Sequence, residues 1–165
     1  MTQKFVGFLR SVNVGGTGKL PMSDLVRMCQ DIGFTEVHTY IASGNVLFST
    51  AMERAAAQRA LEARLLEYCG KTIRVHLRTP EELQGIAADN PFADQAGNKV
   101  AVILLDTPPD QPETKGQKDE EIATGTRELY VHYPDGMGRS KLVIAGTEQG
   151  TARNMNTIAK LVTLL

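Results

Sequence analysis

Apolar residues follow two different periods along the first half of the chain. Short runs that are continuous or alternate with polar residues are typical of strands, and recurrence every three or four residues is typical of amphipathic helices. The pattern predicts four strands, over residues 4–10, 36–41, 46–50 and 72–78. It predicts two helices, over residues 22–32 and 51–69, each followed by a glycine, Gly33 and Gly70.

The order of these elements is β-α-β-β-α-β, which is the order of the ferredoxin-like, split βαβ unit. In that topology the first and third strands are central, and the second and fourth strands lie at the edges. Both helices are expected to cover one face of an antiparallel sheet. The sequence therefore predicts an α+β fold whose first subdomain, residues 1–79, is ferredoxin-like.

The second half of the chain is less regular, and too few strands are evident for it to repeat the first half. The expected elements are a short helix over 80–88, a strongly apolar strand over 99–106, a polar solvated helix over 113–123, a strand over 127–133, a turn-rich basic loop over 134–141 and an amphipathic helix over 151–165. We expect residues 80–165 to form a second, smaller α+β subdomain packed against the first.

Composition excludes several functional classes. The 165 residues include 18 basic and 19 acidic ones, so a strongly basic nucleic-acid module is excluded, although a local basic patch is not. No apolar run is long enough to span a bilayer, and the first residues lack the features of a secretory signal. We expect a cytoplasmic protein in which Cys29 and Cys69, both on apolar helix faces, are reduced core thiols.

Metal and cofactor sites are not predicted. The three histidines, His38, His76 and His132, are far apart in the sequence, and no Cys-x-x-Cys motif is present. The spacing of zinc ligands is therefore missing. We expect neither a metal ion nor a cofactor.

A glycine-rich loop is the first candidate binding feature. Residues 13–19 follow a predicted strand and precede a predicted helix, which is the setting of a phosphate-binding loop. The Walker pattern fails, because Asn13 replaces its first glycine and Leu20 replaces its hydroxyl residue. Two interpretations remain: a looser anion cradle that includes Gly15, Gly16 and Lys19, or a tight turn that needs glycine for its backbone angles.

Two further clusters are basic. Arg139 and Lys141 follow two glycines, and Arg153 and Asn154 lie at the predicted start of the last helix. A cation in a first helical turn opposes the helix dipole, so its position there is favourable if an anion binds at the same point. The alternative is a solvated arginine, or one paired with the acidic residues at 113–121.

The same segments carry a family resemblance. Four motifs stand out: R-x-x-N-V-G-G at 10–16, Y-x-x-S-G-N-V at 40–46, G-R-S-K at 138–141 and T-x-R-N at 151–154. Together they resemble a family of uncharacterised bacterial proteins known as domain of unknown function 1697, over residues 5 to about 161. The resemblance implies a two-subdomain α+β fold with a ferredoxin-like first part. It implies no catalytic residues, because the family has no assigned activity.

The principal functional hypothesis is a binding protein for a phosphorylated molecule or nucleic acid. The candidate ligand-binding residues are Arg10, Asn13, Gly15, Gly16, Lys19, Asn45, Arg139, Lys141, Arg153 and Asn154. One alternative is an enzyme acting on a small phosphorylated substrate, with His132 or Tyr40 as general base. The other is a structural or interaction module without a ligand. The first two hypotheses require the basic clusters to converge.

Overall fold

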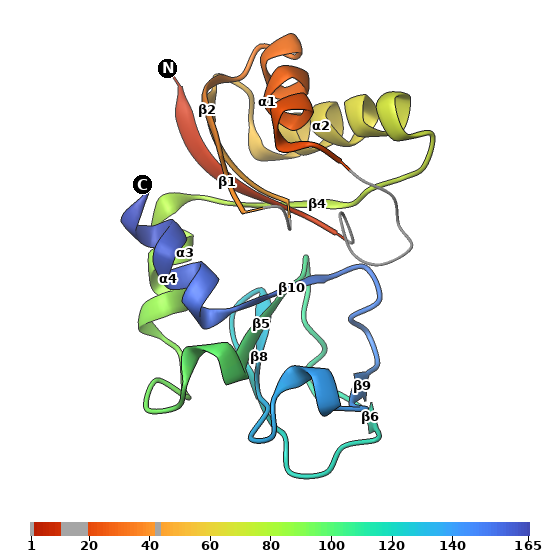
Figure 1. Cartoon of the computed structure of the whole chain (residues 1–165), viewed down its shortest axis with the longest axis vertical. Helices are drawn as coiled ribbons and strands as arrows, with labels where there is room; N and C mark the ends of the chain where they lie inside the picture. The colour runs from red at the N-terminus through yellow and green to blue at the C-terminus, as the bar shows by residue number, and fades with distance from the viewer. Residues whose placement is uncertain (1, 11–19, 42–43) are drawn as a thin grey trace. The chain divides into compact units, whose positions relative to one another are not determined.

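The structure is a computed structural model that describes residues 2–10, 20–41 and 44–165 (Figure 1). The chain divides into two compact units, Met1–Pro80 and Glu81–Leu165. Across the described residues, no helix has both the length and the apolar character needed to cross a membrane.

The first unit is a four-stranded antiparallel sheet with two helices. Its elements in chain order are β1 (Gln3–Leu9), α1 (Met22–Asp31), β2 (Thr35–Tyr40), β3 (Asn45–Thr50), α2 (Arg54–Cys69) and β4 (Val75–Arg78). The strands lie in the order β2-β3-β1-β4, and each neighbouring pair is antiparallel. The predicted order of elements is therefore confirmed, and so is the central position of the first and third strands.

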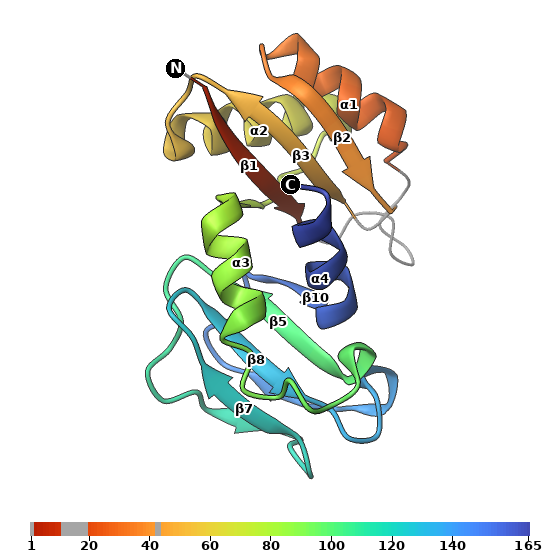
Figure 2. The ribbon, with the colours of Figure 1, turned by 90° about the vertical axis from the view of Figure 1, so that its left-hand side faces the viewer.

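Both helices cover the same face of this sheet (Figure 2). Phe5 and Phe48 project from the two central strands into one core cluster with Leu25 of α1 and Leu61 of α2. The ring of Phe48 also stacks on that of Phe34 with 4.1 Å between centroids. Alternation along the strands places these side chains on one face, so a single apolar layer joins the helices to the sheet.

Amide hydrogen exchange should distinguish central from edge strands in this unit. β1 pairs with strands on both sides, whereas β2 pairs only with β3. We expect the amides of Phe5–Leu9 to exchange at least about tenfold more slowly than those of Val37–Tyr40, because edge amides open by local fluctuations. Equal protection in the two strands would contradict the strand order.

The two cysteines occupy different environments in the helical layer. Cys29 is fully buried, and its burial raises the pKa of the thiol to about 12. Cys69 is half-buried at the last turn of α2, and both cysteines are free thiols.

Thiol labelling tests these environments. The thiolate is the reactive species, so at neutral pH Cys29 should react only as the protein unfolds, whereas Cys69 should react in the native state. Labelling with a chromophoric disulfide reagent, followed by peptide mass spectrometry, measures both rates. Rapid native labelling of Cys29 would show that its site is not closed to solvent.

The second unit is built on another four-stranded antiparallel sheet. Its strands are β5 (Val100–Leu104), β7 (Glu121–Thr124), β8 (Glu128–His132) and β10 (Thr151–Asn154), in the order β10-β5-β8-β7. Two helices, α3 (Pro80–Ala88) and α4 (Met155–Thr163), begin and end the unit. A two-stranded ribbon joins β6 (Thr114–Lys115) to β9 (Val143–Ile144), and two short 3₁₀ turns cover Gly97–Lys99 and Met137–Arg139.

The central strands of this sheet, β5 and β8, carry buried residues on both faces. On one face Tyr130 of β8 donates a hydrogen bond of 2.8 Å from its hydroxyl to the carbonyl oxygen of Ile86 in α3. Figure 2 shows α3 and α4 side by side on this face. On the other face Leu129 and Val131 pack against Ile144 of the ribbon. The ribbon therefore takes the place that a second layer of helices would occupy.

The predicted helix over residues 113–123 is wrong. The segment forms β6, a turn and β7, in which Ile122 pairs with Val131 of β8. Gly116 has a φ of 71°, which ends any helical path at that point. Pairing to β8 and burial of Ile122 outweigh the helical propensity of a polar, acidic stretch.

The predicted start of the last helix is also wrong. Residues Thr151–Asn154 form β10 and pair with Ala101–Leu104 of β5, and α4 begins only at Met155. Arg153 therefore lies in a strand and not in a first helical turn, and the argument that placed it against the helix dipole fails. The sequence did not show this strand, because its four residues T-A-R-N lack a clear apolar alternation.

Candidate functional site

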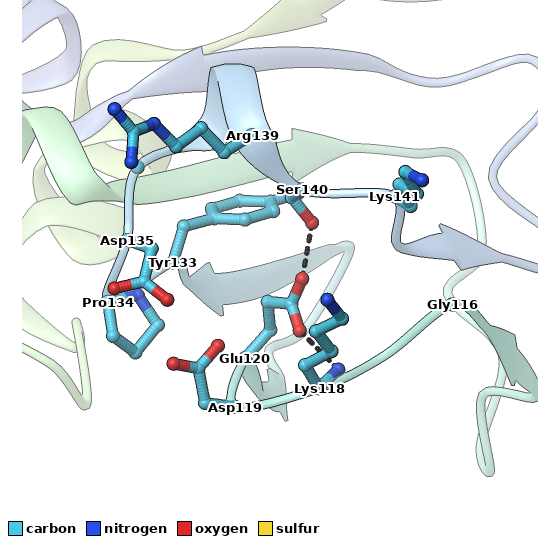
Figure 3. Close-up of a pocket in the computed structure, with 11 residues that line it drawn as sticks. Gly116, Lys118, Asp119, Glu120, Tyr133, Pro134, Asp135, Arg139, Ser140 and Lys141 are labelled. Atoms are coloured by element: carbon cyan, nitrogen blue, oxygen red, sulfur yellow. Dashed lines mark hydrogen bonds between the residues drawn. The ribbon is translucent and has the colours of Figure 1, made fainter.

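A pocket of about 220 Å³ lies within the second unit (Figure 3). Two segments form it: the turn between β6 and β7, and the loop that follows β8. The lining residues are Gly116, Lys118, Asp119, Glu120, Tyr133, Pro134, Asp135, Gly136, Arg139, Ser140 and Lys141. The G-R-S-K motif thus forms one wall, opposite a turn that is about twenty residues earlier in the chain.

Glu120 joins the two segments. One of its carboxylate oxygens accepts a hydrogen bond from the Ser140 hydroxyl, and the other accepts one of 2.6 Å from the backbone N–H of Lys118. The Ser140 oxygen in turn accepts a hydrogen bond of 3.1 Å from the N–H of Leu142. The bond from Ser140 and then that from Lys118 hold the pKa of Glu120 below its usual value, so the carboxylate is charged at neutral pH.

Gly116 brings the turn close to the motif loop. A Cβ atom at this position would overlap the carbonyl oxygen of Lys141, which is a backbone atom and cannot easily move aside. The positive φ of Gly116 is likewise strained for other residues. A glycine is therefore needed here for the two walls to approach each other.

Tyr133 lies between the walls, and Figure 3 shows its ring at the centre of the pocket. Its N–H donates a hydrogen bond of 2.7 Å to the carbonyl oxygen of Lys99, which fixes the start of the loop to the sheet. Burial, followed by the nearby charge of Glu120, raises the pKa of the Tyr133 phenol above its usual value. The Tyr133 phenol is therefore neutral at physiological pH, and its hydroxyl can donate or accept a hydrogen bond.

Charged side chains of both signs line the remaining wall. Lys118, Arg139 and Lys141 are cationic and exposed, and Asp119 and Asp135 are anionic and exposed. In the part of the chain that the structure describes, no ion pair engages any of these five side chains. The pocket thus presents unneutralised cations and carboxylates to anything that enters it.

The structure brings two of the predicted site residues, Arg139 and Lys141, to this pocket. It does not bring Arg153 there. The Arg153 guanidinium donates to the Thr151 hydroxyl at 2.8 Å and to the Ala152 carbonyl oxygen at 2.9 Å, and burial lowers its pKa to about 10. Asn154 is the N-cap of α4, where its side-chain oxygen accepts a hydrogen bond of 2.9 Å from the Thr157 N–H.

Arg153 also lies on the face of the sheet opposite to the ribbon. It pairs with Val102, which in turn pairs with Tyr130, so these three side chains share the face on which Tyr130 contacts α3. The pocket loop packs on the other face, together with Leu129. The sheet itself therefore separates Arg153 from Arg139 and Lys141.

The remaining predicted residues belong to the first unit. The Asn45 amide is buried, and it donates a hydrogen bond of 2.9 Å to the carbonyl oxygen of Tyr40. Arg10 is half-buried, and its backbone N–H bonds to the carbonyl oxygen of Arg74. Four residues of the glycine-rich loop lie outside the described residues: Asn13, Gly15, Gly16 and Lys19.

Neither residue suggested as a general base lines the pocket. The His132 side chain is buried and stacks on the Phe92 ring with 5.6 Å between centroids, and Tyr40 belongs to the first unit. Within the described part of the chain, no group of three or more His, Cys, Asp or Glu side chains is placed to hold a metal ion.

Sequence reasoning missed half of the pocket. Tyr133 and Asp135 are close to the G-R-S-K motif in sequence, and their proximity was a usable signal. No such signal marked Lys118, Asp119 and Glu120, because their segment was predicted to be a solvated helix. The hydrogen bond between Glu120 and Ser140 and the pairing of β6 with β9 bring that segment to the motif.

Comparison with known proteins identifies the family. The chain belongs to the family described as "Protein of unknown function (DUF1697)", whose model matches residues 1–130. The G-R-S-K and T-x-R-N segments lie beyond the matched residues, so the match is shorter than the sequence resemblance indicated. No curated protein matches the chain.

A solved structure has the same fold. The chain is similar to the conserved bacterial protein SP0830 from Streptococcus pneumoniae, with a TM-score of 0.81 and 19% sequence identity. The similarity covers 100% of this chain and 99% of that one. At this identity the comparison establishes a mixed α+β fold with antiparallel sheets, and it carries no function to this chain.

Ser140→Ala should make the stability of the protein less dependent on acid pH. The pKa of Glu120 is lower in the folded protein than in the unfolded chain. The carboxylate therefore stabilises the folded protein above the pKa that it has in the unfolded chain, and this stabilisation is lost as the pH falls through its pKa in the folded protein. Removal of the Ser140 hydroxyl should lower the Tm by a few degrees at neutral pH. The difference from the parent should shrink below about pH 4.

Scanning calorimetry from neutral to acid pH measures this difference. Ser23→Ala, at an exposed position in α1, is the matched control and should leave the pH profile of the parent unchanged. A Ser140→Ala variant whose profile parallels that of the parent would show that Ser140 does not stabilise the Glu120 carboxylate.

Proposed function

We propose that this protein binds a small phosphorylated molecule in the pocket of its second unit. The observation that carries the proposal is the presence of three cations around one concave site, Lys118, Arg139 and Lys141, which no ion pair engages in the part of the chain that the structure describes. Arginine and lysine are the side chains that bind phosphate oxygens, arginine in bidentate fashion. Ligand sites in proteins are concave and contain a few such polar groups.

The state of Glu120 supports the same conclusion. A carboxylate next to cations would normally compete with an anionic ligand for them. Here hydrogen bonds from Ser140 and from the Lys118 backbone occupy its two oxygens. The nearby charge of Lys118 also interacts with this carboxylate, so Arg139 and Lys141 are the cations that keep the greater capacity for an external anion.

The size and composition of the pocket favour a small molecule over nucleic acid. Its volume of about 220 Å³ is below the roughly 300–1,000 Å³ of sites for drug-sized ligands. Asp119 and Asp135 on its wall would repel a polyanionic backbone. Among the described residues, Tyr133 is the one aromatic side chain that lines the pocket, whereas single-stranded nucleic acids are bound on several stacking rings.

Binding fits these groups better than catalysis does. A general base is most effective when its pKa is close to the working pH. The pKa of Glu120 is shifted down, and the pKa of Tyr133 is shifted up, so both move away from neutrality. An enzyme acting on a phosphorylated substrate remains the alternative, with either of the pocket aspartates as its base.

We further infer that the first unit is ferredoxin-like and that residues 1–79 and 80–165 are distinct subdomains. The strand order β2-β3-β1-β4, with two helices on one face, supports the first inference. Two compact units that meet at residue 80 support the second. The free thiols of Cys29 and Cys69 favour a reducing, cytoplasmic location.

Thermal denaturation in different anions tests the binding proposal. Phosphate should raise the Tm of the parent more than chloride does at equal ionic strength. At about a hundred times the dissociation constant, binding would contribute about 2.7 kcal/mol. Arg139→Ala combined with Lys141→Ala should abolish this gain, and it should change the stability in chloride by less than about 0.5 kcal/mol, because both side chains are exposed.

The matched control removes the same two charge types elsewhere. Arg59→Ala combined with Lys160→Ala changes an exposed arginine in α2 and an exposed lysine in α4, and it should respond to phosphate as the parent does. The control is needed because phosphate also stabilises folded proteins by exclusion from their surface. If both double variants keep the full phosphate response, the pocket does not bind the anion.

A further inference from the structure

Tyr133 gives the pocket a flat aromatic surface. Its ring lies at the centre of the pocket, between the turn before β7 and the loop after β8 (Figure 3). Tyr133 directly follows β8, and its backbone N–H bonds to the carbonyl oxygen of Lys99, so its attachment to the sheet is fixed. In the part of the chain that the structure describes, the Tyr133 hydroxyl makes no hydrogen bond. Ring and hydroxyl are both available to a ligand.

Cations and carboxylates are mixed around this ring. Figure 3 shows Arg139 and Asp135 on one side of the tyrosine ring and Lys141 on the opposite side. Lys118 and Asp119 are neighbours in the chain, and both line the same pocket. Hydrogen-bond donors and acceptors are therefore close to each other at more than one point of the wall.

A ligand with several hydroxyl groups fits such a mixture. A hydroxyl donates one hydrogen bond and accepts others, so it can contact a carboxylate and a cation at the same time. A doubly charged phosphate only accepts hydrogen bonds, and a nearby carboxylate repels it. Phosphate alone thus gains from the cations and loses at Asp119 and Asp135, whereas a hydroxylated ligand gains from both kinds of side chain.

The aromatic ring favours a cyclic form of this ligand. The face of an aromatic ring carries partial negative charge, which attracts C–H groups with partial positive charge. A sugar ring has a face of C–H groups and a rim of hydroxyls. When such a face packs on Tyr133, the rim points towards the charged side chains that surround the tyrosine.

Lys141 is the cation best placed for a phosphate on this ligand. It lies on the side of the Tyr133 ring opposite to Asp135 (Figure 3). The preceding residue, Ser140, donates its hydroxyl hydrogen bond to Glu120 and so engages that carboxylate. A phosphate is therefore repelled less strongly beside Lys141 than beside Asp135.

We propose that the pocket binds a sugar phosphate, with the sugar ring packed on Tyr133, its hydroxyls bonded to Arg139 and Asp135, and its phosphate bound by Lys141. This inference rests on the proposed function and adds the chemical class of the ligand. Tyr133 is the specificity-determining residue, because its ring contacts the sugar and contributes nothing to the binding of phosphate alone.

Two probes with the same skeleton test the inference. Glucose 6-phosphate and cyclohexylmethyl phosphate each have a six-membered ring that carries a phosphorylated CH₂ group, and they differ in the hydroxyls and the ring oxygen. At about pH 8 both phosphates are doubly charged. We expect calorimetric titration of the full chain to give a dissociation constant about tenfold lower for glucose 6-phosphate, the gain from one or two hydrogen bonds.

Variants of Tyr133 test the role of its ring. Tyr133→Phe keeps the aromatic face and should bind glucose 6-phosphate within about threefold of the parent, whereas Tyr133→Leu should bind it about tenfold more weakly. Tyr68→Leu, at an exposed tyrosine of α2, is the matched control and should bind as the parent does. Thermal denaturation of each variant in chloride verifies that it is folded at the temperature of the titration.

Asp135→Ala tests the contact with the hydroxyls. It removes an acceptor that only glucose 6-phosphate uses, so the preference over cyclohexylmethyl phosphate should shrink. Asp110→Ala, at an exposed position outside the pocket, is the matched control and should keep the preference. Lys141→Ala should weaken the binding of both probes, because both carry the phosphate.

Each contrary outcome has a separate meaning. If the parent binds cyclohexylmethyl phosphate as tightly as glucose 6-phosphate, the sugar inference is wrong and phosphate binding stands. A folded Tyr133→Leu variant with the affinity of the parent would overturn the role of the ring, and a preference that survives Asp135→Ala would overturn the assignment of the hydroxyl contacts. Binding of neither probe would overturn the proposed function and this inference with it.

Discussion

In the sheet of β5, β7, β8 and β10 the central strands β5 and β8 carry buried residues on both faces, and the structure of the second unit depends on covering both faces. Strand β8 is buried along its whole length, from Glu128 to His132. Helices α3 and α4 lie on one face, and the ribbon of β6 and β9 supplies Ile144 to the other. Since burial of apolar area is the main favourable contribution to folding, neither cover can be absent. The pocket forms on the side of the sheet that the ribbon of β6 and β9 covers.

The position of the ribbon also explains why a carboxylate is buried at the pocket. The turn before β7 and the loop before β9 must meet for the ribbon to close over the sheet. A buried carboxylate is tolerated only when hydrogen bonds satisfy its oxygens. Glu120 meets this condition with donors from both segments, Ser140 on one side and the Lys118 N–H on the other. The same bonds that close the fold therefore orient the side chains on either side of Ser140.

Glu120 and the other charged side chains of the pocket have different roles. Glu120 is held at low pKa by its hydrogen bonds and serves the fold. Arg139 and Lys141 are exposed beside Ser140, and Asp119 is exposed beside Glu120. Asp119, Arg139 and Lys141 are thus each adjacent in sequence to a residue held by the hydrogen bond between Glu120 and Ser140, which limits the conformational entropy lost when a ligand binds. A rigid link flanked by exposed charges is suited to recognition of a small charged molecule.

The sequence by itself determined the first unit, because its elements follow from local periodicity: Ile73, Val75 and Leu77 alternate, and Ala57, Leu61 and Leu65 recur every four residues. It also marked Arg139 and Lys141 as a basic cluster. Only the tertiary structure decided that residues 113–123 and 151–154 are extended, since those segments gain their hydrogen bonds from β8, β9 and β5. For the same reason only the fold could show Arg153 bonded within its own strand and Glu120 bonded to Ser140. Contacts between residues distant in sequence leave no local periodicity, and the candidate site consists of such contacts.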